Sequence, residues 1–301
     1  MSEPHSPRGL LGATGLWTIQ LEGLPSSALR ETVQEIEALG WPALWIPETF
    51  GREALSASAL LLSATERLVV VTGIATIWGR DPSTAAMGHR TLTEAFPERF
   101  VFGLGISHPN LVGARGHTWA KPVTAMREYL DTMDMIQYRS VQPTTAMYRL
   151  LAALQPRMLA LSAEKAAGAH TYLVTPEHTA TAREILGPNP VLAPEQMVIL
   201  QDDPAEARRI ARLYLAPYLA QPNYQNSLRR LGFTDDDFGG GGTDGLIDAL
   251  VAWGAEDAIL KRIQAHHDAG ADHVCVQPLA DPTQGFPIVP IRRLSEALLP
   301  T

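Results

Sequence analysis

His108 and Glu48 are the two side chains whose chemistry and place in the sequence best suit acid–base work. His108 follows the apolar run 100–106 almost directly, and Glu48 comes soon after the apolar residues 44–46. An imidazole titrates near neutral pH, so it can donate a proton to a reacting group or accept one from it. The alternative for His108 is a hydrogen-bonded structural role. The carboxylate of Glu48 can bind a cofactor ring or cap the next turn, and the sequence does not choose between the two.

The segment 69–82 has a different pattern, which predicts a binding site for a large flat ligand. It begins as a β-branched apolar run, which is typical of a strand buried on both faces. The run breaks at Gly73, passes through small residues, and restarts as a helix at Pro82 with Asp81 as its cap. A strand that ends in small residues leaves space for a ring-shaped cofactor. The cofactor-binding residues expected here are Gly73, Ile74, Ala75 and Thr76.

Several enzyme classes lack their signatures in this sequence. It has no clustered Cys/His set for a zinc or iron site, no Gly-x-Ser-x-Gly nucleophile motif, and no glycine-rich phosphate loop ending in Lys-Ser or Lys-Thr. We therefore expect no metal. The neighbouring His266 and His267 would point about 100° apart on a helix, so we interpret them as part of a solvated helix face.

The composition narrows the class of protein further. The 301 residues are 46% hydrophobic, which supports a large core, and the formal net charge of -8 argues against binding nucleic acid or an anionic membrane. The single cysteine, Cys275, lies in an apolar run, so we expect a buried thiol and a reducing compartment. No apolar stretch approaches the ~18 residues of a membrane-spanning helix, and residues 1–8 lack a signal-peptide pattern. We expect a cytoplasmic protein that acts on a small-molecule substrate.

Short apolar runs alternate with helix-period stretches along the chain. Because parallel neighbours need a crossover connection, repeated strand–helix units predict a parallel sheet, and eight units predict a closed (β/α)8 TIM barrel. The rival is an open doubly wound sheet, but residues 22–25 after the first strand read Glu-Gly-Leu-Pro rather than Gly-x-Gly-x-x-Gly. The strands are expected at 17–21, 44–46, 68–74, 100–106, 149–153, 169–174, 197–200 and 273–277.

We predict a single barrel domain over residues 1–301, with an insertion at about 216–245 before the last strand. Within it, 235–242 reads Asp-Asp-Asp-Phe-Gly-Gly-Gly-Gly. The aspartates lack the alternating spacing of a calcium loop, and four consecutive glycines do not suit a packed element. We interpret this stretch as a flexible, solvated hinge or the edge of a lid.

The active site of such a barrel lies at the C-terminal ends of its strands. His108 and Glu48 both fall there. The turn Gln155-Pro156-Arg157 follows the fifth predicted strand and opens a helix. Backbone N–H groups at a helix N-terminus can hold a phosphate, and a nearby arginine strengthens such a site. The alternative is an arginine that is simply solvated.

Five segments, in order, resemble the luciferase-like monooxygenase superfamily in its branch of coenzyme F420-dependent oxidoreductases. The resemblance implies a (β/α) barrel with an insertion before the last strand. It implies coenzyme F420 in the barrel mouth, with FMN as the alternative, and a non-proline cis peptide near Gly73-Ile74. The similarity extends from about residue 17 to residue 298, and the segments are 72–82, 99–108, 121–130, 168–176 and 269–276.

The same resemblance assigns further cofactor contacts. The family's phosphate loop maps onto 153–157, and its ring-edge contacts map near the start of the sixth strand. The residues that these positions add to the cofactor-binding set are Ala153, Gln155, Arg157, Gly168 and Ala169. Ser107 and His108, which follow the fourth predicted strand, complete the set.

The sequence also departs from the sugar-phosphate and alcohol dehydrogenases of that branch. Thr49 stands where they carry a catalytic histidine, Glu53 lies near the position of their tryptophan, and His108 stands where they carry a glutamate. The substrates of those enzymes are therefore not carried over to this chain.

The leading hypothesis is an F420-dependent oxidoreductase that moves a hydride between coenzyme F420 and an unidentified small organic substrate, with His108 and Glu48 as catalytic residues. An FMN-dependent luciferase-like monooxygenase, which needs oxygen and a partner flavin reductase, is the alternative among enzymes. A non-catalytic cofactor-binding barrel is the alternative outside them. The resemblance is compatible with a homodimer.

Overall fold

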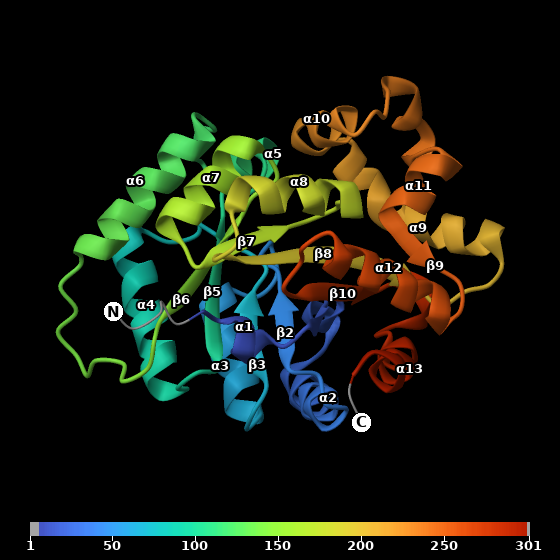
Figure 1. Cartoon of the computed structure of the whole chain (residues 1–301). Helices are drawn as coiled ribbons and strands as arrows, with labels where there is room; N and C mark the ends of the chain where they lie inside the picture. Colours follow the sequence, from blue (N-terminus) through green and yellow to red (C-terminus); the bar gives the residue numbers. More distant parts are fainter. Residues whose placement is uncertain (1–5, 300–301) are drawn as a thin grey trace.

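Eight parallel strands close into a barrel at the centre of the computed structural model, which describes residues 6–299 (Figure 1). Strand β10 pairs with β8 on one side and with β1 on the other, which closes the ring. The predicted (β/α)8 barrel is confirmed. Its strands are β1 (Thr14–Trp17), β2 (Ala43–Ile46), β3 (Val69–Thr72), β5 (Phe100–Gly105), β6 (Tyr148–Ala152), β7 (Gly168–Thr171), β8 (Val191–Ile199) and β10 (Val274–Pro278).

Two short strands extend the ring. Strand β4 (Ala75–Thr76) follows β3 and pairs with β5, and β9 (Val251–Trp253) pairs with β8. Between β3 and β4 the Gly73–Ile74 peptide bond is cis, as the family resemblance implied.

Helices cover the outside of the barrel (Figure 1). Side-chain oxygens of Asp81, Thr175 and Asp203 cap three of them, and each cap is followed by a proline at the first helical position. The helices are α1 (Arg8–Leu11), α2 (Ser26–Ala38), α3 (Ala54–Ala64), α4 (Pro82–Ala95), α5 (Pro109–Ala114), α6 (Pro122–Met135), α7 (Pro156–Lys165), α8 (Pro176–Leu186), α9 (Pro204–Leu219), α10 (Pro222–Arg230), α11 (Asp244–Leu250), α12 (Glu256–Asp268) and α13 (Ile288–Leu298).

Three apolar clusters hold these layers together. Trp17, Trp45 and Cys275 belong to a cluster built mainly from strand residues, and a larger cluster joins the strands to the surrounding helices. The third joins α9, α10 and α11 to β8 and β9. Burial of each large apolar side chain contributes about 1.5–3 kcal/mol. Cys275 is buried and free, as predicted.

The first strand lies earlier in the chain than predicted. Strand β1 ends at Trp17, and residues Gln20–Gly23 form a 3₁₀ turn where the prediction placed the strand. The register of β1 is set by its pairing with β10 and β2, where Thr14 lies opposite Val274 and Leu16 opposite Leu44. These long-range pairings determine that residues 14–17, rather than the overlapping apolar segment 17–21, form the strand. The local sequence pattern does not distinguish the two segments.

Strand β8, the seventh of the predicted strands, is longer than predicted. It begins at Val191 rather than at residue 197, and Pro194 lies inside it, opposite Thr171 of β7. A proline argues against the interior of a strand because it cannot donate to the ladder. Burial of the whole strand between its neighbours outweighs that local signal.

Two segments that connect elements of the barrel are folded. The stretch 107–121 contains α5. In the glycine run, Gly240, Gly241 and Gly242 have φ values of 62°, 83° and 106°, which side-chain-bearing residues rarely adopt. Two of these glycines lie against Arg212 and Leu219 of α9. The expectation that this run could not belong to a packed element was therefore wrong.

His266 is buried, so the predicted solvated face was wrong for this residue. Its ring nitrogens lie 2.9 Å from the hydroxyl of Thr179 and 3.0 Å from the amide oxygen of Gln196. Helix α12 packs against α8 and β8, and this packing covers His266.

Two features are absent from residues 6–299. No helix in that range is both long enough and apolar enough to cross a membrane. In the same range, no group of three or more His, Cys, Asp or Glu side chains is arranged to hold a metal ion.

Candidate functional site

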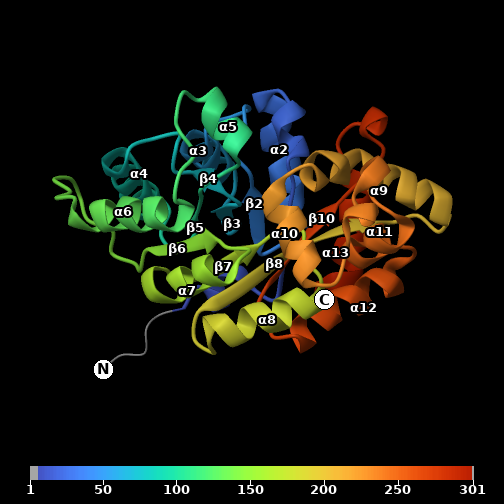
Figure 2. The ribbon, with the colours of Figure 1, turned by 90° about the horizontal axis from the view of Figure 1, so that it is seen from above.

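A cavity of about 1140 Å³ lies at the C-terminal ends of the barrel strands. Residues that end or follow six of the strands line it, and helices α6, α7 and α10 close its sides. Seen from above in Figure 2, α5 and α10 lie on the near side of the strands. The predicted site residues that line this cavity are Glu48, Gly73, Ile74, Ser107, His108, Ala153, Gln155 and Arg157.

Four predicted cofactor residues do not line the cavity. Ala75 and Thr76 form β4 and are buried, and Gly168 and Ala169 begin β7 and are also buried. Strand β7 presents His170 to the cavity, and Tyr172, which follows the strand, lines it as well. The roles of the four residues stay predictions.

His108 stands half-buried at the start of α5. Its Nδ1 is buried without a hydrogen-bond partner, and its ring lies 5.5 Å from the ring of Tyr224 in α10. Burial lowers the pKa of His108, and Asn223 beside it partly raises that pKa again. The ring is therefore neutral at pH 7, with one nitrogen as a donor and the other as an acceptor.

Glycines in β5 let the strand that carries His108 lie close to β3. A Cβ on Gly103 would come within 1.8 Å of the carbonyl oxygen of Thr72, and one on Gly105 within 2.5 Å of the Ile74 side chain. The Thr72 hydroxyl donates to the carbonyl oxygen of Gly103 at 2.7 Å. These contacts fix His108 relative to the Gly73–Ile74 segment.

The Glu48 carboxylate is fully occupied by contacts within the protein. Its oxygens accept from the backbone N–H groups of Ala54 and Thr76 at 3.1 and 2.8 Å, and it forms an ion pair with Arg80. The side chains of Glu48 and Arg80 are each only 4% exposed, and Arg80 also pairs with Glu53. These contacts agree with the predicted alternative in which Glu48 caps the next turn. They join β2, β4 and α3 at the cavity wall. A catalytic role for Glu48 stays a prediction.

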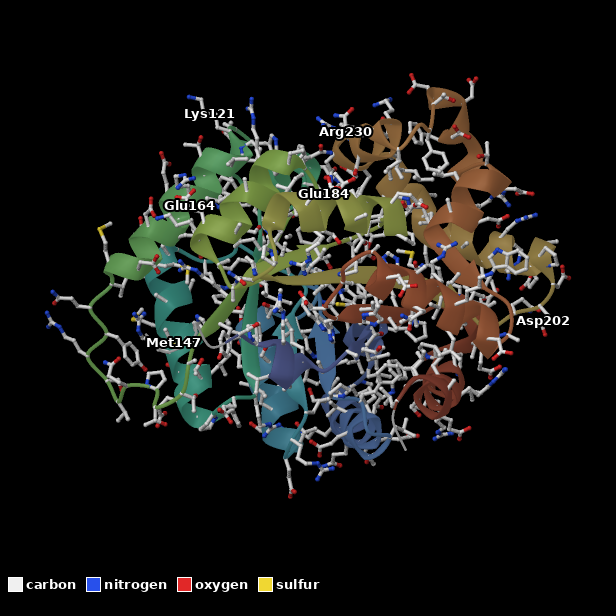
Figure 3. The ribbon with its side chains drawn as sticks, in the orientation of Figure 1. Lys121, Met147, Glu164, Glu184, Asp202 and Arg230 are labelled. Carbon is white, nitrogen blue, oxygen red and sulfur yellow. The ribbon has the colours of Figure 1, made fainter. Side chains whose placement is uncertain are left out.

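The cavity is electropositive although the chain carries a net charge of -8. Its lining includes Lys121, Arg157 and Arg230, and within residues 6–299 none of the three forms a salt bridge. The lining carboxylate, Glu48, is neutralised by Arg80. Figure 3 shows Lys121 and Arg230 at the same end of the molecule. Such a site favours a ligand that carries negative charge.

Gln155 supplies an unsatisfied polar group to the cavity wall. Both atoms of its side-chain amide are buried without a partner. It directly precedes α7, whose first turn carries Arg157. Pro156 has no N–H group, and the N–H groups of Met158 and Leu159 bond to the carbonyl oxygen of Gln155. The arginine and the unpartnered amide are therefore the groups here that suit a phosphate. The residues present therefore fit a phosphate-bearing cofactor such as F420 or FMN.

Aromatic side chains that the sequence reasoning missed form one wall. The ring of Tyr172 lies 5.3 Å from that of Trp17 and 5.3 Å from that of Tyr218, which in turn lies 5.6 Å from that of Tyr224. The Tyr172 hydroxyl lies 3.2 Å from the Tyr218 hydroxyl. It also donates to the side-chain amide oxygen of Gln277 at 3.0 Å. Burial raises the pKa of Tyr172 well above its usual value, so it stays neutral.

Two buried titratable groups lie in the adjoining barrel core. His170 stacks on Trp45 at 4.6 Å, and its Nδ1 donates to the carbonyl oxygen of Ala193 at 2.8 Å. Burial lowers the pKa of His170 to about 4. Glu195 accepts a bond from the N–H of Leu173 at 3.2 Å, and burial raises the pKa of Glu195 to about 8. Both side chains are therefore mostly uncharged at neutral pH.

Comparisons with known proteins agree with this fold. A coenzyme F420-dependent oxidoreductase of Mycobacterium tuberculosis, provisionally so named, is 31% identical over 139 residues, which span 45% of this chain and 39% of that protein. The 5,10-methylenetetrahydromethanopterin reductase of Archaeoglobus fulgidus is 22% identical, over 89% of this chain and 92% of the reductase. The chain thus matches less than half the length of the first relative.

Solved structures at low sequence identity share the fold. An F420-dependent secondary alcohol dehydrogenase in complex with an F420–acetone adduct superposes with a TM-score of 0.75 at 16% identity, over 95% of this chain and 98% of the enzyme. The FMN-bound oxygenating component of 3,6-diketocamphane monooxygenase from Pseudomonas putida superposes with a TM-score of 0.67 at 16% identity, over 94% and 95% of the two chains.

The family assignment comes from the sequence itself. Residues 10–273 match the model of the luciferase-like monooxygenase family. That match covers most of the chain, including the strand ends that line the cavity. The chain therefore belongs to the luciferase-like monooxygenase family.

Proposed function

We propose that this chain is an oxidoreductase that transfers a hydride between coenzyme F420 and a small organic substrate. The observation that carries the proposal is His108, a neutral, half-buried imidazole that lines the cavity. Hydride transfer to or from an alcohol or carbonyl carbon requires a proton to move at the neighbouring oxygen. His108 is the group that gives or takes this proton.

The cavity lining supports an anionic cofactor. Arg157 and Gln155 at the start of α7 suit its phosphate, and Lys121 and Arg230 add positive charge. Gly73 and Ile74 line the cavity and would back the ring, as the family resemblance implies. When bound, a deazaflavin supplies the carbon that accepts or donates the hydride.

The surrounding residues exclude water and keep protons in place. Trp17, Tyr172 and Tyr218 form an apolar wall, which strengthens polar interactions inside the cavity. The hydroxyl of Tyr172 is held in hydrogen bonds and stays protonated, so it does not compete with His108 as a base. His170 also lines the cavity, but burial lowers its pKa to about 4, so His108 is the lining histidine that we assign to proton transfer.

A second candidate function is an FMN-dependent monooxygenase. It is favoured by the structural likeness to an FMN-bound monooxygenase component. This function would require oxygen and a partner flavin reductase. A non-catalytic barrel is the third candidate, and it would retain a cofactor without turning over any substrate.

The proposal includes a homodimer, which a mass measurement in solution tests.

A cofactor titration tests the proposal. Purified protein at micromolar concentration is titrated against F420 and, separately, against FMN, with fluorescence as the readout. We expect quenching of F420 fluorescence and no change with FMN. Binding of FMN alone, followed by oxygen consumption when reduced FMN is supplied, would replace the proposal with the monooxygenase. Tight F420 binding without turnover across alcohols and aldehydes would favour the non-catalytic barrel.

A further inference from the structure

Helix α10 brings Asn223 next to His108. The helix belongs to the 216–245 insertion, and both Asn223 and Tyr224 of its first turn line the cavity. Asn226 and Arg230 follow Asn223 at positions i+3 and i+7 and also line the cavity. This spacing puts the three side chains on one helical face, so one face of α10 is turned towards the site.

Two polar atoms at this contact lack partners. The Nδ1 of His108 and the Oδ1 of Asn223 are both buried, and neither has a hydrogen-bond partner. An amide oxygen can only accept a hydrogen bond, whereas a ring nitrogen of a neutral imidazole accepts or donates according to the tautomer. With the proton on Nδ1, a hydrogen bond between the two atoms would satisfy both. In that tautomer the proton-free nitrogen is Nε2.

Among residues 6–299, no charged side chain competes with Asn223 for the His108 ring. The titratable side chain packed against its ring is Tyr224, whose pKa burial raises well above the usual value, so it stays neutral. Burial and Asn223 are the two influences on the pKa of His108, and no charged side chain contributes. Asn223 raises that pKa, which is the effect of an oxygen that accepts from the ring.

We propose that Asn223 is a positioning residue that fixes the tautomer of His108, so that Nδ1–H donates to the Asn223 amide oxygen and Nε2 faces the substrate oxygen. The proposal rests on the proposed function for the identity of the reaction. When an alcohol is oxidised, its O–H bond breaks and the proton moves to Nε2. The C–H electron pair would leave as hydride, which a bound deazaflavin would accept, and a C=O bond would form. Reduction of a carbonyl runs the same steps in reverse.

The proposal assigns a chemical role to the insertion. The nitrogen that is not transferring a proton determines which tautomer an imidazole adopts. Here the partner of that nitrogen comes from α10 rather than from a barrel strand. The substrate class that such a pair accepts is an alcohol or carbonyl compound whose reacting oxygen reaches Nε2.

Ring-nitrogen NMR of the full chain tests the proposal without requiring a substrate. Spectra of the wild type are compared with those of Asn223→Leu and Asn223→Asp, and His108→Gln assigns the signals. We expect the Nδ1–H tautomer in the wild type, a shift towards Nε2–H in Asn223→Leu, and retention of Nδ1–H in Asn223→Asp with a higher pKa of His108. Asn110→Ala, at an exposed asparagine of α5, is the matched control.

The kinetic arm uses any alcohol or aldehyde that the wild type turns over. We expect Asn223→Leu to lower kcat by about 10-fold or more with a smaller change in KM, and Asn223→Asp to restore kcat with the pH profile displaced upward.

An unchanged tautomer in Asn223→Leu overturns the proposal. If Asn223→Leu does not fold, the absence of an increase in the pKa of His108 in Asn223→Asp overturns it. Absence of F420 binding in the wild type, with the tautomer shift intact, would instead remove the proposed function.

Discussion

The indole N–H of Trp17 donates to the carbonyl oxygen of Gly73 at 3.1 Å. This bond joins the end of β1 to the segment that follows β3, and the Trp17 ring also packs against Tyr172 at 5.3 Å. Three parts of the cavity wall, from β1, β3 and the end of β7, therefore meet at one aromatic ring.

Gly73→Ala should disrupt this junction. A Cβ at residue 73 would lie 2.8 Å from Nε1 of Trp17 and 3.1 Å from the ring of Trp45. Neither buried ring can move without shifting its neighbours, so we expect a loss of about 1–3 kcal/mol in the free energy of unfolding, measured in urea. Gly113→Ala, where nothing lies within 4 Å of the added Cβ, is the control. Equal stability of the two variants would contradict the argument.

Arg157→Ala should weaken the binding of a phosphate-bearing cofactor. Arg157 lies in the first turn of α7, lines the cavity and has no salt-bridge partner among the described residues. Because its side chain is exposed, we expect a modest loss of about 10-fold in affinity and a weaker dependence of affinity on salt. Arg139→Ala is the matched control, since Arg139 is exposed in the loop before β6 and outside the lining. A Kd that does not differ between the variants would exclude an anion at this helix start.

Local sequence signals were sufficient for most of the barrel. Helix α4 begins at Pro82 with Asp81 as its cap, as the sequence predicts. His108 could be assigned to the mouth of the barrel because it follows a buried apolar strand, and strand ends share one face of a closed parallel sheet. These inferences need only neighbours in the chain.

The rest of the site depends on contacts between distant residues. Arg80, 32 residues away in the chain, forms an ion pair with Glu48, and no local sequence pattern predicts that ion pair. Asn223 and Tyr224 reach His108 only because α10 packs over the cavity mouth. His170 could have been found, because side chains alternate along a strand and Ala169 faces away from the cavity when His170 faces it.

His108→Ala should lower turnover by about 100-fold, the scale for loss of a general acid or base, with a much smaller change in the Kd for F420. Burial lowers the pKa of His108, so the ring is uncharged at neutral pH and one of its nitrogens can accept a proton. Alcohol oxidation, which needs a base, should slow as pH falls through that pKa, and this limb should disappear in the variant. His117→Ala is the control, because His117 is exposed and outside the lining. Unchanged turnover in His108→Ala would remove His108 from the mechanism.

Acid should destabilise the fold through its buried histidines. Burial lowers the pKa of His170 and His273 to about 4, and of His89 and His266 to about 3. The unfolded chain therefore binds more protons below about pH 6.5. Stability is fully present above that pH and is lost as pH falls towards 4, by up to about 3 kcal/mol for each histidine. Urea unfolding at a series of pH values measures the loss, and a free energy of unfolding that stays constant from pH 7 to about pH 4.5 would contradict it.

Glu195→Gln should stabilise the fold at alkaline pH. Burial raises the pKa of Glu195 from 4.5 to about 8, so the folded chain holds a proton that the unfolded chain releases. Stability from this group is present below pH 4.5 and is lost as pH rises through 8. Glutamine carries no titrating proton, and its amide oxygen can still accept from the N–H of Leu173. The free energy of unfolding of Glu195→Gln should therefore exceed that of the wild type by more at about pH 8.5 than at about pH 5. A difference independent of pH would mean that Glu195 does not hold its proton in the folded chain.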